Sequence, residues 1–190
     1  ELRTPLNVVL GMAQLLGDTQ LSNDQKSFAN SIERSGKVLL SLIEDILDVS
    51  RIGAGMIKLD AVSFNLAELV ADVIEIFKPQ TSKKNVALEA KVTPKSNCNV
   101  IGDPTRLRQV LVNLIGNSIK FTDQGSIVLE VSEKISKSTG ENSFEFSVTD
   151  TGIGIAEEDH HRLFQRFSQV ETGSSRRFGG TGLGLMISKH

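Results

Sequence analysis

Apolar residues in the first fifty positions recur at alternating steps of four and three, the spacing of amphipathic helices. The first run comprises Leu2, Leu6, Val9, Ala13 and Leu16. The second keeps the spacing over three heptads, broken only by Ser35: Phe28, Ile32, Ser35, Leu39, Leu42, Ile46 and Val49. Gly17-Asp18 and Ser22-Asn23-Asp24 mark a turn between the runs. The pattern therefore predicts a helical hairpin.

The apolar faces of this hairpin are too wide to be buried by two helices alone. A dimer of hairpins would bury them in a four-helix bundle. The alternative is that the hairpin packs on the rest of its own chain, and the long, regular heptad repeat favours the dimer. Pro5 allows two interpretations: the first helix begins there, or the proline kinks the helix beside a site.

Beyond the hairpin, the pattern changes to strands and helices. Gly53 and Gly55 interrupt the helical spacing, so we expect one domain at residues 1–54 and a second at residues 55–190. Asn65 is expected to cap a helix that ends before Pro79, and Asp103 with Pro104 to open another. A short helix is expected over residues 157–167, with its phenylalanines in the core. Alternating apolar residues predict strands near residues 86–92, 98–101, 127–131 and 144–150.

Composition narrows the function. The chain has 190 residues, 39% of them hydrophobic and 23% charged, with a net charge of −2. This balance argues against non-specific nucleic-acid binding, and no apolar run approaches the roughly 20 residues that span a bilayer. Cys98 is the only cysteine, which fits a reducing cytoplasm and rules out an internal disulfide. Because the chain begins at Glu1 and ends within a predicted helix, we expect a piece truncated at both ends.

Two stretches carry candidate chemistry. The strand that ends at Asp150 runs into a glycine turn, where Gly152 and Gly154 let the backbone approach a flat ligand. On the helix from Asp103, the side chains of Asn113, Asn117 and Lys120 share one face. An asparagine oxygen suits Mg²⁺, and a lysine one turn away can meet a phosphate; a plain turn and a solvated polar face are the alternatives.

A third stretch lies near the end of the chain. Residues 168–180 are polar and carry glycine and arginine, which is typical of a disordered segment or an active-site lid. They lead into Gly180-Thr181-Gly182-Leu183-Gly184, which opens the last predicted helix. Glycines at a helix start can point backbone N–H groups at an anion. The stretch matches neither the P-loop nor the dinucleotide-binding pattern.

In their order along the chain, these stretches resemble the catalytic core of sensor histidine kinases. The resemblance covers nearly the whole chain, and is closest to the hybrid type. It implies an α+β protein: a helical hairpin that forms a four-helix bundle as a dimer, then an α/β sandwich ATP-binding domain of the GHKL (Bergerat) type. The family's boxes correspond to residues 1–7 (H box, at Glu1 to Asn7), 113–122 (N box), 150–155 (G1 box), 163–167 (F box) and 180–185 (G2 box).

The resemblance also implies roles for individual residues. Asp150 would accept a hydrogen bond from the adenine amino group, with Gly152 and Gly154 beside it. Asn117 would bind Mg²⁺, Asn113 would lie near the metal, and Lys120 would contact phosphate. The remaining ATP-binding residues are the backbone of the last glycine stretch and the phenylalanines that anchor the lid: Gly180, Thr181, Gly182, Leu183, Gly184, Phe164 and Phe167.

The family's phosphate-accepting histidine should stand immediately before Glu1, so the chain as given lacks it. Glu1 would then be the general base that orients the imidazole, and Thr4 the residue associated with dephosphorylating the partner. Implied partners are a second copy of the chain and a response-regulator receiver domain, in the cytoplasm, with any membrane attachment through other regions. Two alternatives stay open: a nucleotide-binding signalling scaffold without phosphotransfer, and another ATPase of the superfamily, such as a topoisomerase or chaperone fragment.

Overall fold

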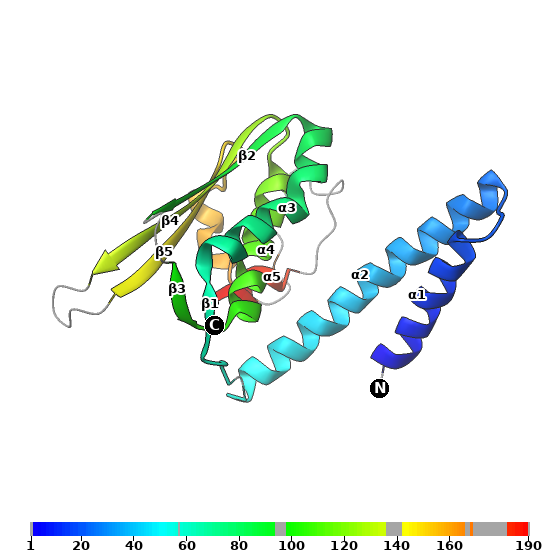
Figure 1. Ribbon diagram of the computed structural model, residues 1–190, viewed down its shortest axis with the longest axis horizontal. Helices are drawn as coiled ribbons and strands as arrows, with labels where there is room; N and C mark the ends of the chain where they lie inside the picture. Colours follow the sequence, from blue (N-terminus) through cyan, green and yellow to red (C-terminus); the bar gives the residue numbers. More distant parts are fainter. Residues whose placement is uncertain are drawn as a thin grey trace. The chain divides into compact units, whose positions relative to one another are not determined.

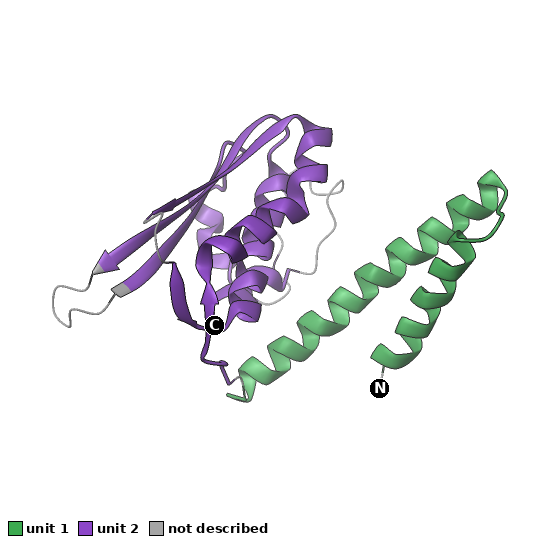
Figure 2. Ribbon diagram, in the orientation of Figure 1, with its two compact units in different colours: residues 1–57 green, residues 58–190 purple. Residues whose placement is uncertain are grey.

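The computed structural model describes residues 2–56, 58–93, 98–135, 142–165, 168 and 182–189. The chain separates into two compact units, residues 1–57 and 58–190 (Figure 2). Within the described part of the chain, no helix is long and apolar enough to cross a membrane.

The first unit is the predicted helical hairpin. Helix α1 spans Arg3–Gly17 and places Pro5 in its first turn, and helix α2 spans Asn23–Gly53. Ser22 caps α2 through a hydrogen bond from the Gln25 backbone N–H, as the polar cluster at the turn predicts. Small residues line the contact between the helices: a Cβ atom on Gly36 would lie 2.6 Å from the Leu10 side chain. The helices therefore approach closely through small residues, and most of the large heptad side chains stay outside the contact.

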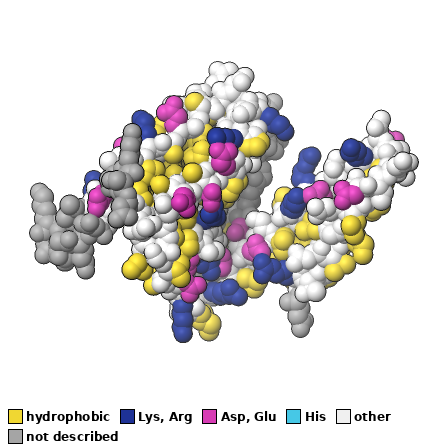
Figure 3. Space-filling view, viewed as in Figure 1, with side chains coloured by type: hydrophobic (Ala, Val, Ile, Leu, Met, Phe, Trp, Pro, Cys, Tyr) yellow, Lys and Arg dark blue, Asp and Glu magenta, His cyan; other side chains and the backbone are white. Residues whose placement is uncertain are grey.

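Most heptad positions of the hairpin are exposed on a single copy, with Ala13 and Val49 as the buried exceptions. The exposed fraction is 67% for Phe28, 49% for Leu39 and 50% for Leu16. Figure 3 shows hydrophobic side chains along the outer surface of the hairpin. We call the exposed heptad residues Leu2, Val9, Leu16, Phe28, Ile32, Leu39 and Ile46 the apolar seam. A single hairpin thus leaves its most regular apolar surface uncovered.

The second unit has helices packed on one face of a mixed sheet (Figure 1). The sheet order is β2-β4-β5, with β2 parallel and β5 antiparallel to β4. Strands β1 and β3 form a separate antiparallel pair. The elements are β1 (Val62–Asn65), α3 (Leu66–Lys84), β2 (Val86–Thr93), β3 (Asn99–Gly102), α4 (Pro104–Phe121), β4 (Gly125–Ile135), β5 (Asn142–Asp150), a 3₁₀ helix η1 (Glu157–Arg162) and α5 (Gly184–Lys189). The α+β architecture predicted from the sequence is confirmed.

The core lies between the sheet and the two long helices. On β4, Ile127, Leu129 and Val131 are fully buried, and they alternate with outward residues such as Glu130. The core side of the helices contributes Leu66, Val70, Val73, Phe77, Leu111 and Ile115. The alternating apolar residues of the strand and the apolar faces of the helices therefore pack together in one layer.

One helix end was predicted wrongly. Helix α3 continues past Pro79 to Lys84, although a proline inside a helix costs about 3 kcal/mol. The turn after the proline is held by the core, because Thr81 is buried and Lys84 Nζ donates to the Ile119 carbonyl oxygen at 2.7 Å. Helix α2 ends at Gly53, one of the two glycines expected to interrupt the helical spacing, before a turn where Gly55 has φ +63°.

The turn before β4 is fastened to the end of β5. Thr151 Oγ1 accepts a hydrogen bond from the Ser126 backbone N–H at 3.0 Å, and the Thr151 N–H donates to the Ser126 carbonyl oxygen at 3.1 Å. Gly125 has φ +115°, and a Cβ atom there would lie 2.0 Å from Thr151 Oγ1. Only glycine fits this turn. Gly125 therefore allows Thr151, just after β5, to bond to Ser126 at the start of β4.

We predict that Gly125→Ala destabilises the second unit by roughly 2–4 kcal/mol, through backbone strain and displacement of Thr151. The matched control is Gly116→Ala within α4, where the new Cβ would meet Phe77 at an ordinary 3.8 Å. This control should gain up to about 1 kcal/mol from helix propensity. Urea unfolding of both variants measures the difference, and equal free energies of unfolding would contradict the role of the Gly125 turn.

Candidate functional site

The carboxylate of Asp150 stands at the end of β5, where Asp150 pairs with Ile127 of β4. Its Oδ1 accepts a hydrogen bond from the Gly152 N–H at 2.9 Å, and its Oδ2 accepts one from Ser118 Oγ at 3.0 Å. Ser118 is buried in α4, whereas Asp150 itself is exposed. The carboxylate is therefore held on its inner side and open on its outer side.

Gly152 makes a close approach to the chain itself, and the predicted approach to a flat ligand stays a prediction. A Cβ atom there would lie 2.6 Å from the Phe121 carbonyl oxygen and 2.8 Å from Asp150 Oδ1. The Ile153 N–H donates to the same Phe121 carbonyl at 3.3 Å. Gly154 has φ +69° with open space around it, so it serves the turn and not a close contact. The glycine turn thus brings the end of β5 against the end of α4.

Asn113 of α4 contacts the first turn of α5. Its Nδ2 lies 3.3 Å from the Gly184 carbonyl oxygen and 3.5 Å from Ser188 Oγ. A Cβ atom on Gly184 would lie 3.3 Å from the Asn113 side chain, so a larger residue would press on it. Asn117, one turn further along α4, has no hydrogen-bond partner for its amide among the described residues. The two asparagines therefore differ in how freely they could bind a ligand.

Lys120 completes the polar face of α4. Burial lowers the pKa of its ammonium group below the usual 10.5, because desolvation disfavours the charged form. Its Nζ lies 4.8 Å from the centre of the Phe121 ring. A desolvated cation attracts an anion more strongly than a fully hydrated one does. Lys120 is thus suited to meet a negatively charged group of a ligand.

The last predicted glycine stretch is described only from Gly182 onward. Gly182 has φ +67°, Leu183 is fully buried, and α5 begins at Gly184. Met186 and Ile187 bury the inner face of α5 and anchor it in the second unit. The start of α5 and the polar face of α4 are therefore neighbours, although some seventy positions separate them in the sequence.

Some predicted site residues lie elsewhere. Phe164 was expected in the core, but 45% of it is exposed, and Lys189 Nζ lies 5.5 Å from the centre of its ring. The expected helix over residues 157–167 is the shorter η1, so the phenylalanine is not carried on its inner face. Thr4 is exposed on α1, in the other unit. The other predicted site residues Glu1, Phe167, Gly180 and Thr181 lie outside the described residues.

Ser118 was not predicted as a site residue from the sequence. The position does carry a signal, since Leu111, Ile115 and Ser118 follow the four-and-three spacing of the buried face of α4. A hydroxyl at a core position of a helix needs a partner. The partner, Asp150, lies 32 positions away on another element, and helical spacing alone cannot identify it.

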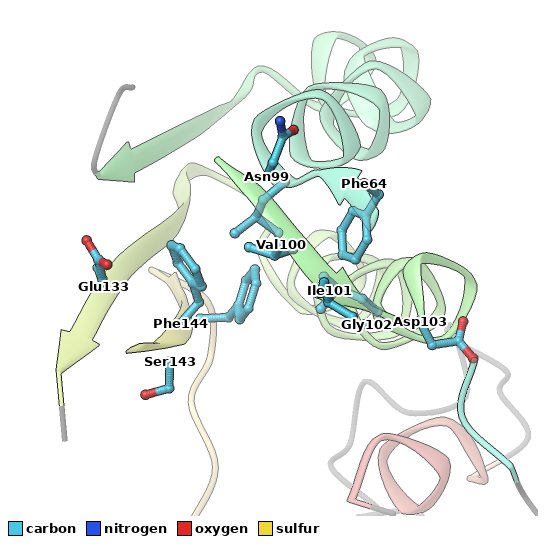
Figure 4. Close-up of a pocket in the computed structure, with 12 residues that line it drawn as sticks. Phe64, Asn99, Val100, Ile101, Gly102, Asp103, Glu133, Ser143 and Phe144 are labelled. Atoms are coloured by element: carbon cyan, nitrogen blue, oxygen red, sulfur yellow. The ribbon is translucent and has the colours of Figure 1, made fainter. Parts of the chain in front are cut away.

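An apolar groove lies elsewhere on the second unit, between the β1-β3 pair, the start of α4 and the β4-β5 hairpin (Figure 4). In the close-up, Phe64, Val100 and Phe144 point toward one another across it. None of the predicted ligand-binding residues is among the described residues that line it. The groove and the candidate site are therefore separate features.

Taken together, the candidate site combines four kinds of group. Asp150 offers a fixed acceptor for a donor on a flat ring, and the glycine turn leaves room for the ring. Asparagine oxygens suit Mg²⁺, and Lys120 suits an anion. Such a set can bind a heterocycle that carries a polyanion and a divalent cation.

Two family models match the chain. Residues 1–55 match the His Kinase A (phospho-acceptor) domain. Residues 102–190 match the histidine kinase-, DNA gyrase B-, and HSP90-like ATPase. The two matches fall on the hairpin and on the unit that holds the candidate site, respectively.

Similar proteins cover the whole chain. It is 43% identical over 189 residues to the signal transduction histidine-protein kinase BarA of Escherichia coli (strain K12), of which it covers 20%. It is 44% identical over 190 residues to the sensor protein GacS of Pseudomonas syringae pv. syringae, of which it covers 21%. The chain thus spans about a fifth of the length of these curated relatives.

Solved structures agree with these matches. A crystal structure of full-length ShkA in complex with AMPPNP is 37% identical, with a TM-score of 0.77, over 98% of this chain and 37% of that chain. A nucleotide-free catalytic domain of the histidine kinase ThkA is 30% identical, with a TM-score of 0.53, over 69% of this chain and 78% of that chain.

Proposed function

The chain belongs to the histidine kinases, as a phospho-acceptor hairpin followed by the ATPase unit of a two-component sensor kinase core, and on this premise we propose that it binds Mg-ATP and phosphorylates a histidine. The observation that carries the proposal is the meeting of three separate elements at one site. The end of β5 and the start of α5 both contact α4 there, through the bond from Ser118 to Asp150 and the bond from Asn113 to Gly184.

Asp150 is the proposed acceptor for the adenine amino group. Both of its oxygens already accept one hydrogen bond each, from Ser118 and Gly152, and a carboxylate has about four acceptor positions. The remaining positions face the exposed side of the strand end. Gly152 and Gly154 carry no Cβ atoms that would obstruct a flat ring beside this carboxylate.

Asn117 is the proposed Mg²⁺ ligand, with Asn113 next to the metal. The donor chemistry fits, because amide oxygens are hard ligands that Mg²⁺ accepts alongside phosphate oxygens. The Asn117 amide has no partner among the described residues, so it can turn its oxygen to a metal without losing a hydrogen bond. When bound, Mg²⁺ would neutralise negative charge on the phosphates during transfer.

The phosphates are expected to lie between Lys120 and the start of α5. Nearby phosphate would favour the ammonium form of Lys120 and so oppose the effect of burial on its pKa. Backbone N–H groups of Gly182, Leu183 and Gly184 are the proposed further contacts, in continuity with Gly180 and Thr181. Phe164 and Phe167 are proposed to anchor the segment that follows them.

The proposed transfer joins the γ-phosphorus to an imidazole nitrogen and breaks its bond to the bridging oxygen, so ADP leaves. The acceptor would be the residue that precedes Glu1. Glu1 would accept the proton of the other imidazole nitrogen and so orient the ring. The phosphoryl group would then pass to an aspartate of a cytoplasmic response regulator, and Thr4 would act in removing it from that partner.

The decisive experiment is phosphate incorporation from γ-labelled ATP into the chain extended upstream by its natural residues. We expect acid-labile, base-stable label on the residue before Glu1, because phosphohistidine hydrolyses in acid. Asp150→Asn is the control and should lose most of the label, since its amide presents a donor to the adenine amino group. Mg-ATP binding without label would favour a signalling scaffold, and acid-stable label would contradict histidine transfer.

Removing the proposed metal ligand should make nucleotide binding insensitive to Mg²⁺. For Asn117→Ala, we expect the ATP affinity with Mg²⁺ to fall to about the affinity measured in EDTA, a loss of roughly tenfold or more. Calorimetric titration with and without Mg²⁺ measures this. The control is Asn99→Ala on β3, which should retain its Mg²⁺ dependence; retained dependence in the Asn117 variant would refute the assignment.

We also propose that the hairpin forms a homodimer through the apolar seam. Its residues are exposed on a single hairpin, yet they repeat every seven positions, as the buried positions of a helix bundle do. Pairing two hairpins would cover the seams of both in a four-helix bundle.

A charge on the seam should therefore separate the two copies. We expect Leu39→Glu to convert a dimer into a monomer at micromolar concentration, as measured by light scattering over a range of concentrations. The matched control is Lys37→Glu, which places the same charge at an exposed position two residues away, outside the seam. A wild-type chain that stays monomeric at every concentration would rule the dimer out.

A further inference from the structure

A buried hydroxyl contacts the proposed adenine acceptor from behind. Ser118 is 6% exposed, and its Oγ donates to Asp150 Oδ2 at 3.0 Å. We propose that Ser118 is a positioning residue that sets the selectivity of the site for a 6-amino purine. This inference deepens the proposed function and rests on it, because it requires Asp150 to meet the purine amino group.

The hydrogen bond of Ser118 differs from those of other hydroxyls in the helices of this chain. Ser31, Ser50, Thr81 and Ser188 each donate to the carbonyl oxygen four residues earlier, at 2.9 to 3.2 Å. That local bond is the usual choice of a serine or threonine inside a helix. Ser118 instead donates across an interface to a side chain of β5. Its hydroxyl thus bonds to a residue of β5 and not to the backbone of its own helix.

The bond removes freedom from a carboxylate that would otherwise have much of it. Asp150 is exposed, and it is the last residue of β5. The Gly152 N–H holds Oδ1 alone, and a single bond leaves the other oxygen free to turn about it. The Ser118 hydroxyl fixes Oδ2, so the plane of the carboxylate is set by two donors from two elements. A ligand then meets an acceptor that is already oriented and loses less entropy on binding.

The surroundings of Asp150 leave few other ways to hold it. Gly152 lies so close that an added Cβ atom would be 2.8 Å from Oδ1, and the Phe121 carbonyl lies on the same side. That carbonyl is an acceptor and can offer the carboxylate nothing. Ser118 is therefore the side chain placed to orient Oδ2. Its loss should weaken the hydrogen bond between Asp150 and the amino group of the ligand.

The test compares two nucleotides that differ in one donor. Titration of the intact chain with ATP and with purine riboside triphosphate, which lacks the 6-amino group, gives two dissociation constants and their ratio. For Ser118→Ala, we expect the affinity for ATP to fall by roughly three- to tenfold. The affinity for purine riboside triphosphate should stay unchanged, so the ratio shrinks. If Ser118 only supported packing, its replacement would lower the affinity for both nucleotides alike.

Further variants separate packing from hydrogen bonding. Ser118→Cys fills the site with a slightly larger side chain of the same shape that donates weakly, so it should reproduce the reduced ratio even where Ser118→Ala folds poorly. The control is Thr81→Val, which removes a buried hydroxyl of α3 from the same unit and should leave the ratio unchanged.

The outcomes distinguish the inference from its premise. A wild-type chain that binds both nucleotides equally would overturn the adenine role of Asp150, and this inference with it. A wild-type chain that prefers ATP, together with Ser118 variants of unchanged ratio, would overturn the positioning role alone. Equal losses for both nucleotides in Ser118→Cys would also overturn it, in favour of a packing role.

Discussion

The contact between the end of α4 and the turn after β5 is the constraint on which the site depends. The Phe121 carbonyl accepts a hydrogen bond from the Ile153 N–H. Gly152 lies so close to this carbonyl that an added Cβ atom would be only 2.6 Å from its oxygen, so the contact requires glycine. A second fastening, from Thr151 to Ser126, fixes the same strand end from the side of β4. These backbone contacts bring the acidic group of β5 to Ser118 of α4, and the candidate ligand-binding groups take their spacing from that junction.

Much of this arrangement follows from local patterns. The hairpin, the strands and the polar face of α4 were predictable because periodicity reports which side of an element is buried. The end of α3 was not, since the turn after Pro79 is held by Lys84 reaching the Ile119 carbonyl on another helix. Phe164 was predicted as core for its apolar character, but the short η1 leaves it half exposed against Lys189. The predictions were wrong where a distant element decides the outcome.

The candidate site shows the same division. Asp150, Asn113 and Asn117 could be named from residue type and spacing, because their chemistry is visible in the sequence. Ser118 could not, since its importance lies in a bond to a residue on another element. The same holds for Asn113, whose amide is engaged by α5, in contrast to Asn117. Sequence patterns predicted groups that would touch a ligand, whereas the hydrogen-bond partners of these groups emerged only from the fold.

The exposed seam of the hairpin has a consequence for how this part of the molecule melts. Within one copy, small residues such as Ala13, Ala29 and Gly36 make the contact between α1 and α2, and they bury little apolar area. If pairing of two seams buries the larger share of the apolar area, the dimer dissociates when the hairpin unfolds. Its thermal midpoint then rises with protein concentration, while that of the second unit, with its own core, does not. Expression level in a cell would thereby set the fraction of folded hairpins.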